Sequence, residues 1–271
     1  MRVVLSGICG RMGTLVARSI AEDEGLLLAG GVEMPGHEQI GRPICDVWEE
    51  SGSRLPVAAD LGDYAPDDYD VIVDFSTPAQ AVSCAEIASR FKKGLVIGTT
   101  GLTQLQMALI QEAAASCPVV VAPNTSVAMN LLFGLVRRAA AVLGPAYDVE
   151  IVETHHRHKK DAPSGTAKKL LRLVSSERKV DPARAARYGR KGMSEGREAD
   201  EIGIHSLRSG AVVGRHHVSF MSDVEELKLS HEALSREAFA RGALRAVRFV
   251  EGRAAGLYDM LDVLGLSGVP E

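Results

Sequence analysis

The chain has 271 residues, of which 46% are hydrophobic and 24% charged, as is ordinary for a globular protein with room for two modest domains. Its net charge of −4 argues against general nucleic-acid binding. No apolar run approaches the roughly 20 residues of a membrane helix, and the apolar start is too short for a signal peptide. The four cysteines form no C-x-x-C pair. We therefore expect a cytoplasmic protein with free thiols and with neither a membrane nor a nucleic-acid partner.

A glycine turn follows the first predicted strand, Val3–Ser6. The sequence G-I-C-G-R-M-G places glycines at 7, 10 and 13, and a helical pattern of apolar residues follows. Strand, glycine turn and helix is the context of a dinucleotide fingerprint. Gly7 would form the tight turn, Gly10 would admit a pyrophosphate, and Gly13 would let the helix pack closely. The spacing is not the commoner G-x-G-x-x-G, so this pattern alone is weak.

The second predicted strand, Leu26–Val32, strengthens this interpretation. It ends at Glu33, 20 positions after Gly13, where an acidic residue is expected to bind the adenosine ribose hydroxyls. The alternative is a solvated glutamate at a strand end.

Strands and helices then alternate. Residues 35–66 have a poor pattern and predict loops, with a short helix near Asp46–Glu50. The further strands are Asp70–Phe75, Leu95–Ile97 and Val119–Ala122; the further helices are Pro78–Arg90, Thr103–Ser116 and one that ends near Leu143. This order predicts a parallel sheet with helices on both faces.

Each of these strands ends in a loop of small or polar residues. The loops are Asp74–Thr77, Gly98–Gly101 and Ala122–Ser126. Ligands bind at the carboxyl ends of parallel strands, so these loops should line the nicotinamide half of a cleft. Ordinary turns would explain any one loop, but explain all three less well. Asp74 we interpret as a strand-end hydrogen-bonding residue rather than a catalytic acid.

The pattern changes after residue 145. Asp148–Glu153 alternates as a half-buried strand does, and Lys179–Asp200 predicts a long loop. Three strands follow at Ile202–Arg208, Ala211–Phe220 and Glu225–Ser230, with Ser209–Gly210 as a tight turn between the first two. They predict an antiparallel sheet with one open face, which suggests an oligomer interface. A helix from about Ser235 to Val250 and a short segment, Tyr258–Leu264, end the chain.

The stretch E-T-H-H-R-H-K-K-D-A-P-S-G-T, from Glu153 to Thr166, contains three of the eight histidines. Ser164 or a neighbour would cap the following helix, and Gly165 and Thr166 would present backbone N–H groups to an anion. Lysines add positive charge, and the histidines can titrate near neutral pH. Together they predict a site for a small acidic substrate.

Other interpretations of the histidines are weaker. If the strand from Asp148 continues, His156 and His158 share a face and His155 points away, so three ligands would not converge and no metal site is expected. A run of basic residues in an acidic chain more often serves a small anion or a solvated face than nucleic acid. The pair His216–His217 we interpret as structural or interfacial.

With these motifs in hand, the chain resembles the dihydrodipicolinate reductase family, the 4-hydroxy-tetrahydrodipicolinate reductases of lysine and diaminopimelate biosynthesis. The resemblance covers nearly the whole chain, and E-x-H-H-x-x-K-x-D-A-P-S-G-T is highly specific to that family. It implies a Rossmann-like parallel-sheet nucleotide domain, residues 1–126 with 236–271. It also implies an α+β mixed-sheet domain for substrate binding and tetramerisation, residues 127–235.

The resemblance also implies roles for particular residues. His155 and Lys159 would be catalytic, and His156, Gly165 and Thr166 would bind substrate carboxylates. Glu33 would bind the adenosine ribose. The other implied cofactor residues are Gly7, Ile8, Cys9, Gly10, Arg11 and Met12 at the pyrophosphate, and Gly98, Thr99, Thr100, Ala122, Pro123, Asn124 and Thr125 at the nicotinamide.

Two positions depart from the commoner family pattern. Many members have arginine directly after the ribose glutamate, where it can pair with the 2′-phosphate of NADP, and this chain has Met34. The change removes a charge-assisted contact and leaves Glu33 to repel the phosphate, so NADH should be preferred over NADPH. Many members also have an aromatic residue where this chain has Thr125, from which we draw nothing firm.

The implied reaction is NAD(P)H-dependent reduction of a cyclic imine that bears two carboxylates. His155 would donate a proton, and Lys159 would polarise the ring nitrogen. Two alternatives remain open: a non-catalytic NAD(P)-sensing protein, or a related dehydrogenase of an amino-acid precursor. Neither alternative needs the histidine, lysine and capped glycine turn together.

Overall fold

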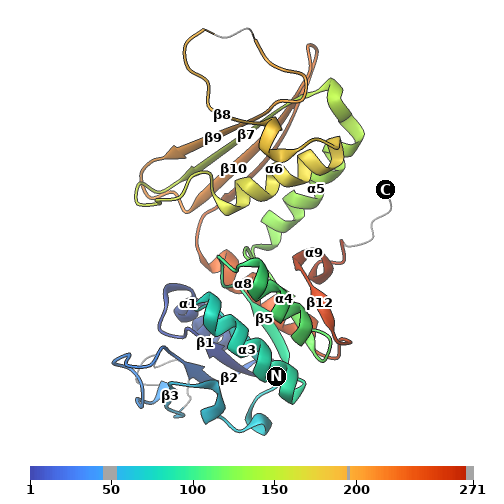
Figure 1. The fold of residues 1–271 in the computed structure, drawn as a ribbon. Coiled ribbons are helices and arrows are strands. Elements are labelled where there is room, and N and C mark those ends of the chain that lie inside the picture. Colours follow the sequence, from blue (N-terminus) through green and yellow to red (C-terminus); the bar gives the residue numbers. More distant parts are fainter. Residues whose placement is uncertain (45–53, 194–195, 267–271) are drawn as a thin grey trace. The chain divides into compact units, whose positions relative to one another are not determined.

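The computed structural model describes residues 1–44, 54–193 and 196–266 (Figure 1). The chain forms two compact units. Unit 1 consists of Met1–Val127 with Arg236–Glu271, and unit 2 of Ala128–Ser235. The short helix expected near Asp46–Glu50 lies outside the described residues.

Unit 1 contains a seven-stranded sheet in the order β12-β6-β5-β4-β1-β2-β3, in which every pair of neighbours is parallel. The strands are β1 (Arg2–Ser6), β2 (Leu27–Val32), β3 (Val57–Ala58), β4 (Val71–Asp74), β5 (Gly94–Ile97), β6 (Pro118–Val121) and β12 (Gly256–Tyr258). The predicted parallel sheet is confirmed. The strands β3 and β12 were not predicted, because two or three residues are too few to show a period.

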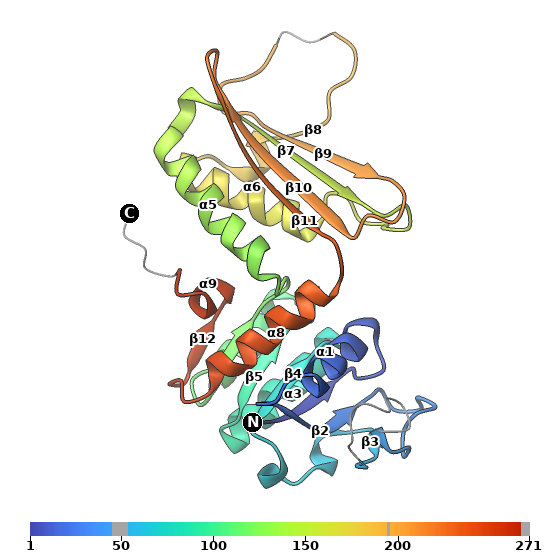
Figure 2. The same ribbon diagram turned by 180° about the vertical axis from the view of Figure 1, so that it is seen from behind.

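Helices cover both faces of this sheet (Figure 2). One face packs on α1 (Arg11–Ala21) and α8 (Glu237–Val250), and the other on α3 (Pro78–Phe91) and α4 (Gln104–Ala113). Neighbouring residues of one strand enter different cores: Leu5 lies in the first and Val4 in the second. This is why the strands are continuous apolar runs. The short elements are η2 (Leu61–Asp63), η3 (Pro66–Asp68) and α9 (Met260–Val263).

Unit 2 contains a five-stranded mixed sheet in the order β11-β10-β7-β9-β8. The strands are β7 (Asp148–His155), β8 (Ala186–Tyr188), β9 (Ile202–Arg208), β10 (Gly214–Met221) and β11 (Glu226–Ala233). The apolar sides of α5 (Val127–Leu143) and α6 (Gly165–Arg178) share one core with this sheet. The short elements are η4 (Gly144–Ala146) and α7 (Pro182–Ala185).

The predicted hairpin of Ile202–Arg208 with Ala211–Phe220 is wrong. Strand β7 lies between them, parallel to β9 and antiparallel to β10. The turn lies against the end of β7, where Ser209 donates its N–H to the carbonyl of His155. The sequence pattern predicted that these segments are strands, but it did not predict which strands are neighbours in the sheet. The resemblance, which implied a mixed sheet, was right. The expected long loop Lys179–Asp200 also contains α7 and β8.

Helix α5 corrects the expectation that no apolar run approaches the length of a membrane helix. With the turn after it, the segment Val127–Ala146 is long and apolar enough, by length and composition, to cross a membrane. Core helices of soluble proteins pass the same test, and Met129, Phe133 and Val136 are buried in the core of unit 2. The criterion is therefore weak evidence here.

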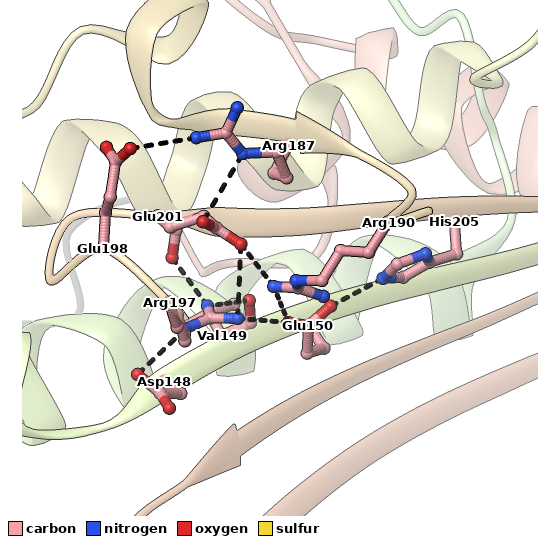
Figure 3. A network of polar contacts seen from close by, with 9 residues as sticks. All are labelled: Asp148, Val149, Glu150, Arg187, Arg190, Arg197, Glu198, Glu201 and His205. Carbon is pink, nitrogen blue, oxygen red and sulfur yellow. Dashed lines mark hydrogen bonds and ion pairs between the residues drawn. The ribbon is translucent and has the colours of Figure 1, made fainter. Parts of the chain in front are cut away.

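An ionic network binds the segment between β8 and β9 to the sheet (Figure 3). Glu150 on β7 pairs with Arg190 and Arg197 of that segment and with His205 on β9. Glu201 pairs with Arg190 and with Arg187. The network gives an otherwise irregular segment fixed attachments to β7.

Candidate functional site

The glycine turn of unit 1 has the backbone that only glycine adopts easily. Gly7 has φ of 77°, and a Cβ atom there would lie 2.4 Å from the carbonyl oxygen of Phe75. A Cβ at Gly13 would lie 2.0 Å from the carbonyl oxygen of Gly7. The first glycine is therefore required for the turn and the third for close packing of α1 on it, as the sequence predicted.

The start of α1 suits an anionic group. Gly10 is the N-cap, which offers no side chain to the first N–H groups, and the first turn contains no acidic residue. Backbone N–H groups and the helix dipole at such an end favour a phosphate. The predicted residues Ile8, Cys9, Arg11 and Met12 flank this point in the sequence, so the turn fits a dinucleotide pyrophosphate.

Glu33 lies against the glycine turn. One of its carboxylate oxygens accepts the backbone N–H of Cys9 at 3.0 Å, and the other accepts that of Met34 at 3.0 Å. The carboxylate is thus held at the end of β2 beside the turn. The side chain of Met34 is 66% exposed.

A cavity of about 470 Å³ lies at the carboxyl ends of the strands of unit 1. The sequence-predicted residues Gly98, Thr99, Thr100 and Ala122–Thr125 line it, as does Arg11. Gly98 leaves room for the ring of Phe75, whose Cε1 atom would lie 2.1 Å from an added Cβ. Sequence reasoning missed Arg236 and Phe239, because they belong to the returning C-terminal segment and no local motif marks them.

Two polar residues stabilise the loops of this cavity. Asp74 is fully buried; it accepts the hydroxyl of Thr99 at 2.5 Å and that of Ser76, which confirms a strand-end hydrogen-bonding role. Burial raises the pKa of this carboxyl, although the hydroxyls oppose the shift. Thr125 donates its hydroxyl to the carbonyl of Phe239 at 2.6 Å, which ties its loop to α8.

In unit 2, His155 ends strand β7 beside buried Glu153. Its Nδ1 lies 2.5 Å from a carboxylate oxygen of Glu153. Arg208, which pairs with His155 across the strands, donates to both oxygens of that carboxylate, at 3.0 and 2.9 Å. The sequence predicted His155 but assigned no role to Glu153 or Arg208. Arg208 lies on β9, far along the chain from Glu153 on β7. Its contact with Glu153 could therefore be predicted only from the order of the strands in the sheet.

The start of α6 follows from a cap that the sequence predicted. Ser164 is the N-cap, and its hydroxyl oxygen accepts the N–H of Ala167 at 3.2 Å. A Cβ at Gly165 would meet nothing within 4 Å, so the first residue of the helix faces open space. The ammonium of Lys159 lies 2.9 Å from the carboxylate of Asp161. Cap, open helix start and lysine thus belong to one short segment, which also contains Thr166.

His216 is closer to this site than its sequence suggested. Its ring is 4% exposed, its Nε2 lies 3.3 Å from the hydroxyl of Ser164, and it packs edge-on against His155 with ring centroids 5.2 Å apart. Burial, with a smaller contribution from His155, lowers the pKa of His216 to about 3. It is therefore a neutral, buried neighbour of His155, which agrees with the structural interpretation of this residue. His156 and His158 lie with ring centroids 6.3 Å apart.

One trio of potential metal ligands lies among the described residues, and it is not in the histidine stretch. Ligand atoms of Cys9, Glu33 and His37 all lie within 4.8 Å of one another. Two observations weaken it. The Nδ1 atom of His37 already accepts the N–H of Gln39, which places the proton of a neutral ring on Nε2. Burial, helped by Glu33, raises the pKa of the Cys9 thiol to about 11. Cys9, Cys84 and Cys117 are free, as expected.

Unit 1 thus has the features of a Rossmann-like dinucleotide-binding domain: a parallel sheet, a glycine turn after its first strand, and a cavity where the strands end. Family models agree with this class and extend it to the whole chain. The model described as dihydrodipicolinate reductase, N-terminus, matches residues 1–125, and the one described as dihydrodipicolinate reductase, C-terminus, matches residues 128–264. The chain belongs to the dihydrodipicolinate reductase family, a family of oxidoreductases.

Individual relatives give the same result. The chain is 46% identical over 273 residues to 4-hydroxy-tetrahydrodipicolinate reductase of Anaeromyxobacter sp. (strain Fw109-5), covering 98% of each chain. It is 48% identical over 270 residues to that of Rubrobacter xylanophilus, covering 98% of this chain and 99% of the relative. Among solved structures, dipicolinate-bound dihydrodipicolinate reductase from Paenisporosarcina sp. TG-14 matches with a TM-score of 0.75 at 26% identity, covering 97% of this chain and 98% of that one.

Proposed function

We propose that this protein reduces 4-hydroxy-tetrahydrodipicolinate to tetrahydrodipicolinate in lysine and diaminopimelate biosynthesis, with a reduced nicotinamide dinucleotide as cofactor. The observation that carries the proposal is in unit 2, where a histidine held by a buried carboxylate adjoins an open, serine-capped helix start. The relatives' names and the dipicolinate bound to a structural neighbour support the choice of substrate.

The residues of unit 1 would bind the cofactor. Gly7 to Met12 at the start of α1 would bind its pyrophosphate, Glu33 its adenosine ribose, and the cavity beside Gly98–Thr100 and Ala122–Thr125 its nicotinamide. When bound, the reduced cofactor supplies a hydride.

The residues of unit 2 would bind the substrate and supply the proton. One substrate carboxylate would rest on the N–H groups at the start of α6, at Gly165 and Thr166, and His156 would bind its polar edge. Lys159 would polarise the ring nitrogen. Loss of the hydroxyl as water leaves a conjugated imine, which accepts the hydride at carbon. His155 would then give the proton that the resulting enamine needs.

The first test is an assay with freshly generated 4-hydroxy-tetrahydrodipicolinate, following NADH and NADPH separately by absorbance. We expect consumption at an enzyme-like rate. The variant His155→Gln should lose about 10²–10⁴-fold in kcat with KM little changed. Dinucleotide binding without turnover would instead favour a non-catalytic sensor, or a related dehydrogenase of an amino-acid precursor.

NADH preference is part of the proposal. Met34 follows the ribose-binding Glu33 and carries no charge to pair with a 2′-phosphate, which Glu33 would repel. We expect Met34→Arg to raise kcat/KM for NADPH relative to NADH by about tenfold, the value of one charge-assisted contact of about 1.4 kcal/mol. Met34→Gln, neutral and similar in size, is the control. Equal values for both cofactors in the unmodified enzyme would contradict the preference, with Arg11 then the candidate phosphate partner.

A cytoplasmic homotetramer completes the proposal. Large apolar side chains are exposed in and beside β11, among them Val224 at 90%, Leu227 at 40% and Leu234 at 86%. Burial of such side chains between subunits would be favourable. Sedimentation should give a tetramer, and a monomer would overturn this part alone.

A further inference from the structure

Glu153 is a fully buried carboxylate with several hydrogen-bond partners. One oxygen contacts Nδ1 of His155 and accepts from Arg208; the other accepts a second N–H of Arg208 and the backbone N–H of Ser164 at 3.2 Å. These four contacts, and a hydrogen bond from the side chain of Ser206, all come from unit 2. The carboxylate is therefore a junction between two strands and the start of a helix.

This position is one where the strand pattern calls for an apolar residue. Val149 and Ile151, which precede Glu153 at alternate positions of β7, are fully buried in the core of unit 2. Burial by itself raises the pKa of the Glu153 carboxyl, but His155 and Arg208 outweigh it and hold the pKa below its usual range. The side chain is thus an ion in a core position. Buried ion pairs are seldom more stabilising than apolar residues of similar size, so stability alone does not account for it.

The contact with Nδ1 decides which nitrogen of His155 is available. A carboxylate only accepts hydrogen bonds, so Nδ1 must carry a proton. In the neutral ring Nε2 is then without one, and in the protonated ring Nε2 is the nitrogen that can give its proton away. Gly214 lies beside this nitrogen: a Cβ there would lie 3.2 Å from Nε2, so the glycine leaves it room.

The same carboxylate fixes the helix that begins beside it. Ser164, whose N–H it accepts, is the N-cap of α6. Arg208 extends the connection, because it also donates to the carbonyl of Asp161 at 2.6 Å, within the segment that carries Lys159. Proton donor, lysine segment and anion-binding helix start are thus all attached to one buried ion pair.

We propose that Glu153, held by Arg208, is a positioning residue for the reduction: it fixes His155 in the form that works through Nε2 and sets its place relative to the start of α6. This inference rests on the proposed function only for the identity of the reaction. The tautomer of His155 can be measured without substrate.

The experiment compares Glu153→Gln with Glu150→Gln, a matched change on the same strand at a carboxylate outside the site. In histidine labelled with ¹⁵N, two-bond correlations identify the protonated ring nitrogen, and His155→Gln assigns the signals. We expect Nδ1–H in the unmodified protein and in Glu150→Gln. In Glu153→Gln an amide must replace one carboxylate oxygen, so its NH₂ faces donors, and we expect a mixture of tautomers.

Turnover should follow the tautomer. We expect Glu153→Gln to lose at least about 10²-fold in kcat, most of what a positioned general acid contributes, while Glu150→Gln stays within about twofold. A neutral His155 with its proton on Nε2 in the unmodified protein overturns the proposal even if Glu153→Gln does not fold. So does a folded Glu153→Gln with unchanged kcat. If the unmodified protein shows the expected tautomer of His155 but no reductase activity, the proposed reaction is refuted. The inference that Glu153 fixes the tautomer of His155 would still stand.

Discussion

Strand β7 carries two ionised glutamates, Glu150 and Glu153, which lie three residues apart and therefore on opposite faces of the sheet. Glu150 is 17% exposed and has three cationic or titratable partners, Arg190, Arg197 and His205 (Figure 3). Glu153 is fully buried; among the residues that the structure describes, Arg208 is its one guanidinium partner, and His155 lies beside it. In both, burial alone would raise the carboxyl pKa and the partners lower it.

The two glutamates differ in how many charged partners stabilise them. Glu150 belongs to a network in which several arginines share several carboxylates, so no single contact decides its state. It attaches the segment before β9 to the sheet. Glu153 depends on the single guanidinium of Arg208 for its opposite charge, and its neighbours include the residues that we propose to bind and protonate the substrate. One strand can thus carry two glutamates with different roles: Glu150 attaches a neighbouring segment to one face of the sheet, and Glu153 positions His155 on the other.

The largest expected effect comes from removing the guanidinium partner on each face. Arg208→Met would leave Glu153 charged and buried, which typically costs about 3–5 kcal/mol. Arg190→Met would leave Glu150 with Arg197 and His205, and because Arg190 is 40% exposed we expect at most about 1 kcal/mol. Urea unfolding of both variants, with the slope m checked for constancy, measures the difference. Equal losses of unfolding free energy in the two variants would contradict the proposed difference between Glu150 and Glu153.

The next effect is a pH dependence that belongs to the Glu153 face. His216 contacts Ser164 there, and burial, with His155 adding to it and Glu153 opposing, lowers its pKa to about 3. Between about pH 6.5 and pH 3 the unfolded chain therefore binds a proton at this ring and the folded chain does not. Stability from this group is fully present above about pH 6.5 and falls on acidification, by up to about 1.4 kcal/mol per pH unit.

His216→Gln should remove that slope. Glutamine can keep a polar atom near the hydroxyl of Ser164 but does not titrate. We expect the unfolding midpoint of the variant to change less between pH 7 and pH 5 than that of the unmodified protein. His205→Gln, on the Glu150 face, is the matched control and should keep the slope. An unaltered slope in His216→Gln would show that the ring is accessible to protons in the folded state.

The same comparison shows where sequence reasoning succeeded. Patterns local in the chain gave the glycine turn at Gly7, the place of Glu33 at the end of the second strand, and the cap at Ser164. Each depends on residues within a few positions of one another, in a turn, a strand end or a helix start. The parallel sheet followed as well, because strands buried on both faces are recognisable as apolar runs.

What could not be predicted depends on which strands are neighbours. Arg208 reaches Glu153 only because β9 lies directly beside β7, and the sequence favoured a hairpin of β9 with β10 instead. His216 reaches Ser164 because β10 is the other neighbour of β7. Glu153 itself was visible in the motif, but its role was not, since a carboxylate at an inward strand position has meaning only once its partners are known.

The smallest expected effect separates the two faces with a single methyl group on each. A Cβ at Gly214 would lie 3.2 Å from Nε2 of His155, and one at Gly203 would lie 1.8 Å from a carboxylate oxygen of Glu150. Gly214→Ala should lower kcat by roughly 3- to 10-fold, because small displacements of a reacting group are costly, with little change in unfolding midpoint. Gly203→Ala should displace the Glu150 carboxylate from some of its partners; because the network shares its contacts among several arginines, we expect a loss of about 1 kcal/mol or less, with kcat unchanged. If Nε2 of His155 is the nitrogen that gives the proton, steady-state kinetics should show a loss of kcat only in Gly214→Ala. Calorimetry should show a loss of stability mainly in Gly203→Ala. A loss of kcat in Gly203→Ala equal to that in Gly214→Ala would instead place both faces of β7 in the catalytic machinery.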